Sequence, residues 1–387
     1  MQRKKIVICT TIPETVTLIL CQQPNFLHNC YEVSIVSSPG KGLIEIANKE
    51  RVPVYPVPMK RGINPLYDLY SLLCMVLTLR RIGPDLIHSY TPKAGLIAML
   101  AGWFCRIPVR IHTFTGLIFP SHIGLKKKVL IWIDRLICFC ATKVVPEGRG
   151  VRQDLLDYGI THKPLEVIGH GNIAGVDTAF FAPDQNEVMI RAESLRADLS
   201  IFHDAFVFCF AGRLNRDKGI YELIRAFLEL PDTARLLLVG GHDETLSVDA
   251  ETLNMIDVHP RIDALGFQAD IRPALQLCDV LVLPSYREGF PNVVLQAGAM
   301  SRPVIATDIN GCNEVIESGF NGWLVLPHDA SSLQIAMQSV MKMPKAECKD
   351  MGLRSRERIQ QRFERKQHWD RMLLFYKGML GSEYCID

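Results

Sequence analysis

The residues with the clearest chemical potential lie in the segment 285–300, Ser-Tyr-Arg-Glu-Gly-Phe-Pro-Asn-Val-Val-Leu-Gln-Ala-Gly-Ala-Met. It follows an apolar run, Val280–Leu283, that is typical of a buried strand, and it becomes helical after Pro291. Such a turn aims the free backbone N–H groups at the start of the helix beyond the sheet edge, where they suit an anion. Glu288 and Gln296 are close enough to face one small ligand. The pattern favours a site for a sugar nucleotide, and the alternative is an ordinary strand–turn–helix unit with two incidental polar residues.

Arg213 and Lys218 also lie on a loop between a predicted strand and a predicted helix. In the run Phe208–Ile220 a strand ends at Gly212, and Arg213 and Lys218 lie on the loop before the next helix. Arginine is a planar bidentate donor and lysine a mobile point charge, so the two together suit a diphosphate. Gly212 and Gly219 favour this interpretation over solvated loop cations, because glycine lets the backbone approach a ligand closely.

Two sets of short apolar runs, separated by helical lengths, position these motifs. The first set is Ile6–Cys9, Glu32–Val36, Val52–Val57, Leu86–His88, Val109–Thr113, Thr142–Val145 and Leu165–Ile168. The second set is Phe206–Phe210, Leu236–Val239, Arg261–Leu265, Val280–Leu283, Val304–Ala306 and Gly322–Val325. Strands that alternate with helices predict βαβ units, so we expect an α/β fold of two doubly wound, Rossmann-like domains with parallel sheets and a cleft between them.

The domain boundary is expected near Gly175–Pro183, where Gly, Asp and Pro cluster. A chain of 387 residues also suits two domains better than one. We place the first domain at residues 1–180 and the second at 181–364. The final segment, Met351–Leu380, has helical character, and we expect a helix at about 365–387 to pack back on the first domain.

Composition excludes several classes of protein. A formal net charge of +2 argues against a dedicated nucleic-acid binder. The twelve cysteines show no metal-ligand or redox spacing, as is typical of a reduced cytosol in which cysteine acts as a small apolar residue. No run reaches the roughly 18 apolar residues of a membrane span, and Pro13 interrupts the first apolar run too early for a signal peptide. We therefore expect a cytoplasmic protein.

A series of short motifs follows one order along the second set of strands. They are Gly212-Arg213, Lys218-Gly219, Val239-Gly240-Gly241, Leu265-Gly266-Phe267, Glu288-Gly-Phe-Pro291, Asn313-Glu314 and Asn321-Gly322. The series covers about residues 205–330 and resembles the carboxyl-terminal half of the family 4 retaining glycosyltransferases with the GT-B fold. The overall layout extends the resemblance to the whole chain, and the bacterial capsule, O-antigen and lipid-linked oligosaccharide enzymes are the most similar in pattern.

The resemblance implies roles on the donor side. Arg213 and Lys218 match the pair that holds the donor diphosphate, and Glu288 matches the first acid of the family's paired-glutamate motif, next to the donor sugar. Gln296 stands where the family usually has a second glutamate that binds ribose, a contact that an amide can also make. The loop Gly266–Gln268 matches the one that reads the base. For a donor that we expect to be a UDP-sugar, the implied binding residues are Gly212, Arg213, Lys218, Phe267, Gly289, Phe290, Pro291, Asn292 and Gln296.

The first domain departs from the family at its reaction-centre histidine. The family commonly ends a strand in Thr-x-His, but here Thr115 occupies the histidine's place and His112 lies three residues earlier. On a strand these two side chains point to opposite faces unless a bulge intervenes. Either Thr115 substitutes for the imidazole or the role has moved, and an ordinary buried histidine is the alternative for His112. The candidate catalytic residues are therefore Glu288, Thr115 and His112.

The run Asp85–Gly95 resembles the His-x-His-Thr-Pro-Lys-Ala-Gly pattern of bacterial enzymes that extend lipid-linked polysaccharide intermediates. The resemblance implies that His88, Thr91 and Lys93 contact the acceptor, a polyprenyl-diphosphate-linked sugar. Lys93 at the start of a helix suits an acceptor phosphate, although an ordinary solvated lysine is the alternative.

The segment Gly124–Cys140 contains the cluster Lys126–Lys128 and is otherwise apolar on almost every side of the expected helix. The helix is too short to span a membrane. It suits a membrane interface with Trp132 and the lysines at headgroup level, or a core helix with a basic start. Together with Lys60 and Arg61, it leads us to expect peripheral contact with the inner face of the cytoplasmic membrane.

The resemblance implies a hexosyl- or N-acetylhexosaminyltransferase of surface-polysaccharide synthesis. The resemblance implies front-face attack, in which the leaving phosphate helps to deprotonate the acceptor. The chain contains no Asp-x-Asp pair, so we expect no metal and no other cofactor. A sugar-nucleotide epimerase and a non-catalytic sugar-nucleotide-binding protein stay open as alternatives. A nicotinamide-dependent oxidoreductase would need Gly-x-Gly-x-x-Gly after the first strand, which this chain lacks.

Overall fold

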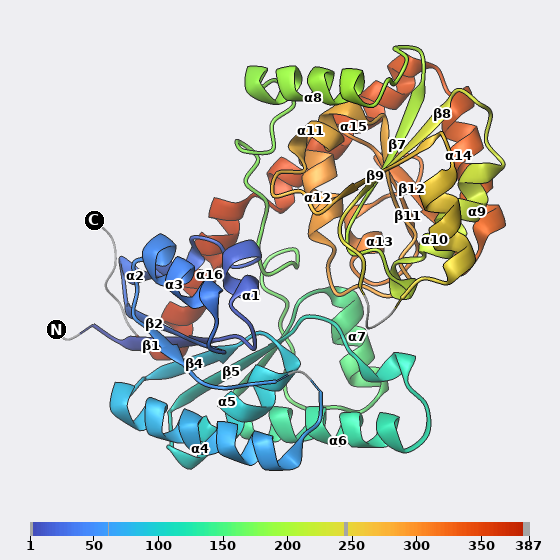
Figure 1. Ribbon diagram of the computed structural model, residues 1–387. Coiled ribbons are helices and arrows are strands. Elements are labelled where there is room, and N and C mark those ends of the chain that lie inside the picture. The colour runs from blue at the N-terminus through green and yellow to red at the C-terminus, as the bar shows by residue number, and fades with distance from the viewer. Residues whose placement is uncertain (1–2, 61, 244–246, 382–387) are drawn as a thin grey trace. The chain divides into compact units, whose positions relative to one another are not determined.

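The computed structural model describes residues 3–60, 62–243 and 247–381, so Arg61 lies outside the described residues. The chain forms two compact units, residues 1–174 with 366–387 and residues 175–365. Each unit contains a parallel six-stranded sheet with helices on both faces (Figure 1). This architecture confirms the expected α/β fold with two doubly wound domains.

The first sheet has the strand order β3-β2-β1-β4-β5-β6, and all neighbouring strands are parallel. Its strands are β1 (Lys5–Cys9), β2 (Glu32–Ser37), β3 (Val54–Pro56), β4 (Leu86–Ser89), β5 (Val109–Phe114) and β6 (Lys143–Pro146). Ile6, Val7 and Ile8 of the inner strand β1 are fully buried. Successive residues are apolar because helices cover both faces of the sheet.

The helices of the first unit lie in two layers. On one side of the sheet in Figure 1 are α4 (Pro65–Ile82), α5 (Pro92–Phe104) and α6 (Gly124–Cys140). On the other side are α1 (Glu14–Leu18), α2 (Gln23–His28), α3 (Lys41–Glu50) and α16 (Arg365–Leu380). The remaining helices are the 3₁₀ turn η1 (Phe119–Ser121) and α7 (Arg149–Asp157). Helix α16 comes from the far end of the chain, and its Trp369 ring lies 5.3 Å from that of Phe26.

The second sheet has the order β12-β11-β10-β7-β8-β9. Its strands are β7 (Phe206–Ala211), β8 (Ala234–Val239), β9 (Ile262–Gly266), β10 (Val280–Leu283), β11 (Val304–Thr307) and β12 (Gly322–Val325). Helices α9 (Ile220–Leu228), α10 (Ala250–Val258) and α14 (Ala330–Lys342) form one layer (Figure 1). The other layer contains α8 (Asn186–Asp198), α11 (Arg272–Leu277), α12 (Asn292–Ala299) and α15 (Lys345–Arg362). The described residues of this unit also form two short elements, η2 (Arg216–Lys218) and α13 (Cys312–Val315).

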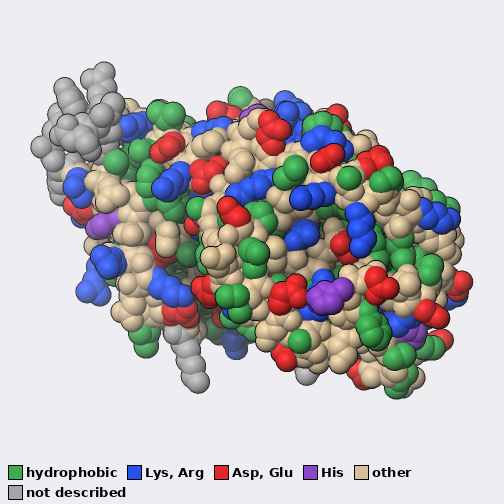
Figure 2. Space-filling view, turned by 90° about the horizontal axis from the view of Figure 1, so that it is seen from above, with side chains coloured by type: hydrophobic (Ala, Val, Ile, Leu, Met, Phe, Trp, Pro, Cys, Tyr) green, Lys and Arg blue, Asp and Glu red, His purple; other side chains and the backbone are tan. Residues whose placement is uncertain are grey.

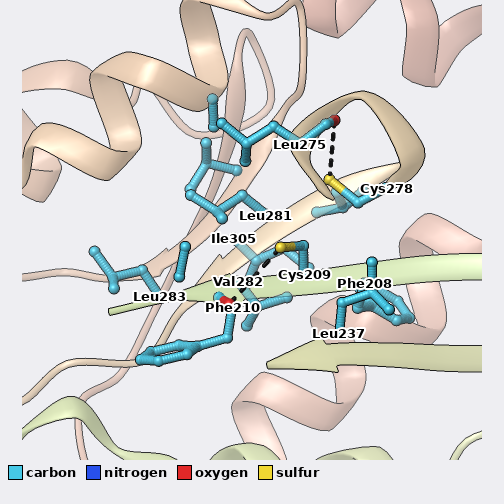
Figure 3. Close-up of a cluster of buried hydrophobic side chains, with 14 of the residues drawn as sticks. Phe208, Cys209, Phe210, Leu237, Leu275, Cys278, Leu281, Val282, Leu283 and Ile305 are labelled. Atoms are coloured by element: carbon cyan, nitrogen blue, oxygen red, sulfur yellow. Dashed lines mark hydrogen bonds between the residues drawn. The ribbon is translucent and has the colours of Figure 1, made fainter. Parts of the chain in front are cut away.

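The core of the second unit gathers side chains from β7, β8, β10, β11 and α11. Figure 3 shows Phe208 and Phe210 of β7 among aliphatic side chains of the neighbouring strands. Cys209 and Cys278 are also fully buried there, as expected for cysteine used as a small apolar residue. On the face drawn in Figure 2, Lys and Arg side chains are interspersed with Asp and Glu, in keeping with the net charge of +2.

One sequence expectation is wrong. Leu165–Ile168 is not a strand, because it forms only an isolated bridge from Leu165 to Val144 beyond the sheet edge at β6. The segment Met351–Leu380 spans the end of α15 and all of α16, which begins at Arg365. The chain breaks between them because Phe363 and Arg365 exchange backbone hydrogen bonds with Val176, at 2.8 and 3.0 Å.

Within the described part of the chain, no helix is both long enough and apolar enough to cross a membrane.

Candidate active site

In the second unit, Arg213 and Lys218 of the loop after β7 each contact an acidic side chain. Arg213 is 63% exposed, and its Nη1 donates to Oδ2 of Asp243 at 2.6 Å. The same Oδ2 accepts from the side-chain amide of Asn215 at 3.2 Å. Asn215 is buried and also accepts from the backbone N–H of Lys218 at 3.1 Å, which fixes the turn η2. Arg213 therefore projects into solvent from a rigid loop.

Lys218 donates to the carboxylate of Glu288, and both side chains are largely buried. The pair lies beside Cys312 of α13, whose thiol pKa is raised by burial and by the neighbouring Glu288 charge. Gly219 allows the loops to approach each other. It has φ +66°, and a Cβ atom there would lie 2.1 Å from the carbonyl oxygen of Pro284. The structure thus brings together two residues that the sequence predicts on separate motifs.

Two further contacts brace the loop after β10. The hydroxyl of Tyr286 donates to the carboxylate of Glu222 on α9, at 2.6 Å. Arg287 donates to Asp217 of η2 at 2.7 Å. These bonds join the loop that carries Glu288 to the loop that carries Lys218, so the position of each depends on the other.

Helix α12 begins directly after this loop, with Pro291 as its N-cap residue. Phe290 is buried and packs on Phe363 at 5.5 Å, so only its backbone is available to a ligand. Gln296 follows Asn292 by one turn on the same helical face and is half-buried. The N-terminal end of α12 gives this edge of the sheet a positive potential.

Phe267 is the most exposed of the predicted donor residues, at 74%. It follows Gly266, whose carbonyl accepts from the N–H of Gly240 at 2.8 Å at the ends of β8 and β9. Its ring therefore stands on a backbone that is fixed at the same sheet edge.

In the first unit, His88 of β4 is completely buried. Its Nδ1 lies 2.6 Å from the hydroxyl of Tyr376 on α16, and its Nε2 lies 2.7 Å from Oγ1 of Thr113. Burial lowers the pKa of His88 well below its ordinary value, with a further contribution from His112. Both ring nitrogens are engaged inside the unit, so the structure does not bring His88 to a surface where it could touch an acceptor.

His112 is also enclosed, whereas Thr115 is not. The Nδ1 of His112 lies 2.8 Å from Oγ of Ser89, and burial lowers its pKa to about 3. Helix α5 passes directly over the ring, and a Cβ atom on Gly95 would lie 2.4 Å from its Cε1. Thr115 follows the end of β5, is half-buried and donates to the carbonyl of Tyr90 at 3.3 Å. Of the two candidates, only Thr115 lies at the carboxyl edge of the sheet.

Thr91 and Lys93 lie at the start of α5, at the same edge. Thr91 Oγ1 accepts from the N–H of Thr11 at 2.9 Å and lies 2.6 Å from the hydroxyl of that residue. Lys93 donates to both carboxylate oxygens of Asp68 on α4, at 2.7 Å each. Neither Asp68 nor Asp243 carries a local sequence signal, because each is defined only by a partner far along the chain.

Comparison with known proteins identifies the family. The model described as "Glycosyl transferase 4-like domain" matches residues 26–171, and the model described as "Glycosyl transferases group 1" matches residues 205–343. The chain belongs to the family 4 glycosyltransferases. It is thus an enzyme, and the resemblance noted in its motifs is confirmed.

This glycosyltransferase is similar over its whole length to the capsular polysaccharide biosynthesis glycosyltransferase CapM of Staphylococcus aureus, with 28% identity and 98% of each chain covered. The UDP-Gal:alpha-D-GlcNAc-diphosphoundecaprenol alpha-1,3-galactosyltransferase of Escherichia coli is 26% identical, with 72% of each chain covered. The N,N'-diacetylbacillosaminyl-diphospho-undecaprenol alpha-1,3-N-acetylgalactosaminyltransferase of Campylobacter jejuni is 29% identical, with 71% of this chain and 72% of that protein covered.

The fold of the glycosyltransferase matches solved structures. Alr3699/HepE of Anabaena, crystallised with UDP and glucose, superimposes with a TM-score of 0.81 at 20% identity. The match covers 97% of this chain and all of that one. The two sheets thus follow the GT-B arrangement that the motif order predicted.

Proposed function

We propose that this glycosyltransferase transfers a sugar, with retention of configuration, from a UDP-sugar to a lipid-linked saccharide in surface-polysaccharide synthesis. The observation that carries the donor side is the contact of Lys218 with Glu288 just before α12, with Arg213 on the same loop as Lys218. Preorganised positive charge of this kind stabilises a departing diphosphate. The relatives that act in capsule synthesis and on diphosphoundecaprenol sugars support the acceptor class.

On the donor side, the diphosphate would replace the acidic side chains that Arg213 and Lys218 contact in this structure. Arg213 would exchange Asp243 for phosphate oxygens, and Lys218 would exchange Glu288 for them. Release from Lys218 leaves the Glu288 carboxylate beside the donor sugar, where it can stabilise positive charge that develops in the transition state. We assign the base contact to the exposed ring of Phe267 and the ribose contact to Gln296.

On the acceptor side, Thr91, Lys93 and Thr115 are the candidates that lie at the carboxyl edge of the first sheet. Lys93, on the first turn of α5, suits a phosphate of the acceptor lipid. Thr115 would position the acceptor hydroxyl, and the leaving phosphate would take its proton in a front-face reaction. His88 and His112 would support this edge from inside, since their rings are enclosed. The absence of an Asp-x-Asp pair supports a reaction that needs no metal.

Peripheral membrane contact is part of the proposal. Helix α6 exposes Leu125, Trp132 and Phe139, at 77%, 63% and 70%. Their spacing of seven residues places them on one helical face, and the lysines Lys126–Lys128 lie at the start of the same helix. Such a helix can lie in the headgroup region of an anionic membrane and be released by salt.

The deciding experiment is transfer from radiolabelled UDP-sugars to a polyprenyl-diphosphate-linked saccharide by the purified full-length protein. We expect labelled lipid product whose glycosidic bond keeps the donor configuration. Lys218→Ala should abolish most of the product, whereas Lys349→Ala, an exposed lysine on α15, should not change it. Donor binding without transfer to any lipid-linked acceptor would favour the non-catalytic sugar-nucleotide-binding protein instead.

A further inference from the structure

The first unit contains a cavity of about 690 Å³ whose apolar interior has no part in the roles proposed above, although Thr91, Lys93 and Lys126 lie on its wall. It is bounded by the start of α5, by α6, and by the segments that follow β1 and β5. Most of its wall is apolar, formed by Ile12, Ile63, Leu96, Ile118, Leu130 and Ile133. The volume lies within the roughly 300–1,000 Å³ of small-molecule sites. A sugar alone would leave this apolar part of the wall without a matching partner.

The cavity also carries cations. Lys93 on α5 and Lys126 on α6 both line it, together with Thr91. Lys126 is exposed, so it lies where the cavity meets solvent. Ile63 and Ile118, at 49% and 38% exposure, continue the apolar wall to the surface. An occupant with an anionic end and a hydrocarbon body would match both features.

A buried carboxyl group indicates how apolar the inner wall is. Asp134 of α6 lines the cavity and is 9% exposed. No residue in the described part of the chain donates a hydrogen bond to it, and burial raises its pKa to about 7. A wall that disfavours the ionised form of a carboxyl group is suited to hydrocarbon rather than to a second anionic group.

We propose that this cavity binds the isoprenoid units next to the diphosphate of the acceptor lipid, with Lys93 and Lys126 on the diphosphate. The enzyme would then withdraw the isoprenoid units next to the diphosphate from the membrane, and would recognise this part of the lipid as well as the saccharide. This inference rests on the proposed function, because it concerns the acceptor of the same reaction.

The test compares farnesyl diphosphate with inorganic diphosphate by calorimetry on the full-length protein. We expect farnesyl diphosphate to bind at least tenfold more tightly. Ile133→Trp fills the cavity and should remove that difference. Ile118→Trp should do the same at the cavity mouth, where a partly exposed position tolerates a larger side chain without unfolding. Leu73→Trp on the outer face of α4, away from the cavity, is the matched control and should bind as the native protein does.

Equal binding of the two diphosphates, or an unchanged preference in both cavity variants, would overturn the inference. Transfer assays separate this result from failure of the proposed function. If the same saccharide on methyl diphosphate and on farnesyl diphosphate is extended equally well, the transferase stands and the lipid cavity does not. A farnesyl preference without transfer of any sugar would support the cavity and refute the proposed acceptor reaction.

Discussion

Replacement of Asp134 by asparagine should stabilise the first unit at pH 8 and leave it nearly unchanged at pH 4. Asp134 lies on α6 with no hydrogen-bond donor among the described residues, and burial raises its pKa from an ordinary 3.8 to about 7. In the folded protein the carboxyl group therefore keeps its proton up to neutral pH, whereas in the unfolded chain it loses the proton near pH 4.

The sign follows from proton counting. Between about pH 4 and 7 the folded state binds one proton more than the unfolded state at this site, so the free energy of unfolding falls as pH rises. At about 1.4 kcal/mol per pH unit, the full loss above pH 7 is about 4 kcal/mol. Asparagine has almost the same shape and does not ionise, so the variant should escape this loss.

The assay is urea unfolding followed by tryptophan fluorescence in a Trp323→Phe background, because the other three tryptophans lie in the first unit. Asp157→Asn, an exposed carboxylate on α7, is the control and should change stability by less than about 0.5 kcal/mol at every pH. The charged neighbours that line the same cavity are Lys93 and Lys126, and His122 lines it too. A stability difference that stays constant from pH 4 to pH 8 would refute the reasoning.

Three further outcomes test the donor site. Lys218→Ala should weaken UDP-sugar binding about 10- to 100-fold, because a charge-assisted phosphate contact contributes roughly 1.5–3 kcal/mol, and unchanged affinity in a titration would remove the clamp assignment. Glu288→Gln should lower the maximal rate and change donor affinity little. Gln296→Glu should stay active and change mainly donor affinity, within about tenfold. Steady-state kinetics that show the reverse would mean that the two roles are exchanged. Activity should persist in excess EDTA, and its loss with rescue by Mg²⁺ or Mn²⁺ would contradict a metal-free reaction.

The sequence predicted the strands well where both faces of a sheet are covered. Val280–Leu283 is an uninterrupted apolar run because helices pack on both sides of it, and the structure has β10 at those residues. Leu165–Ile168 was misjudged because only Ile168 of that run is buried. The physical cause of the break after Phe363 lies outside local patterning, because it is the pair of backbone hydrogen bonds that Val176 forms with Phe363 and Arg365.

The proximity of the candidate donor-side residues was predictable to the extent that they lie in contiguous motifs. The positive charges of Arg213 and Lys218 beside glycines indicate an anion site from the sequence alone. The structure brings Lys218 to Glu288, which lies 70 residues away in the chain. The enclosure of His88 was not predictable, because its partner Tyr376 lies 288 residues further along the chain. Residue type gives a histidine's chemistry, but only tertiary contacts decide whether a ligand can reach it.

The discontinuity of the first unit has a consequence for synthesis on the ribosome. Residues 175–365 are contiguous, so this unit can complete its core as soon as it has emerged. The other unit starts earlier and finishes later, because Trp369 and Tyr376 of α16 pack against it from the last stretch of the chain. Until α16 leaves the exit tunnel, the surface around Phe26 and His88 is uncovered. The nascent chain therefore exposes apolar surface for most of its synthesis, a period in which chaperone binding or premature termination would have its largest effect.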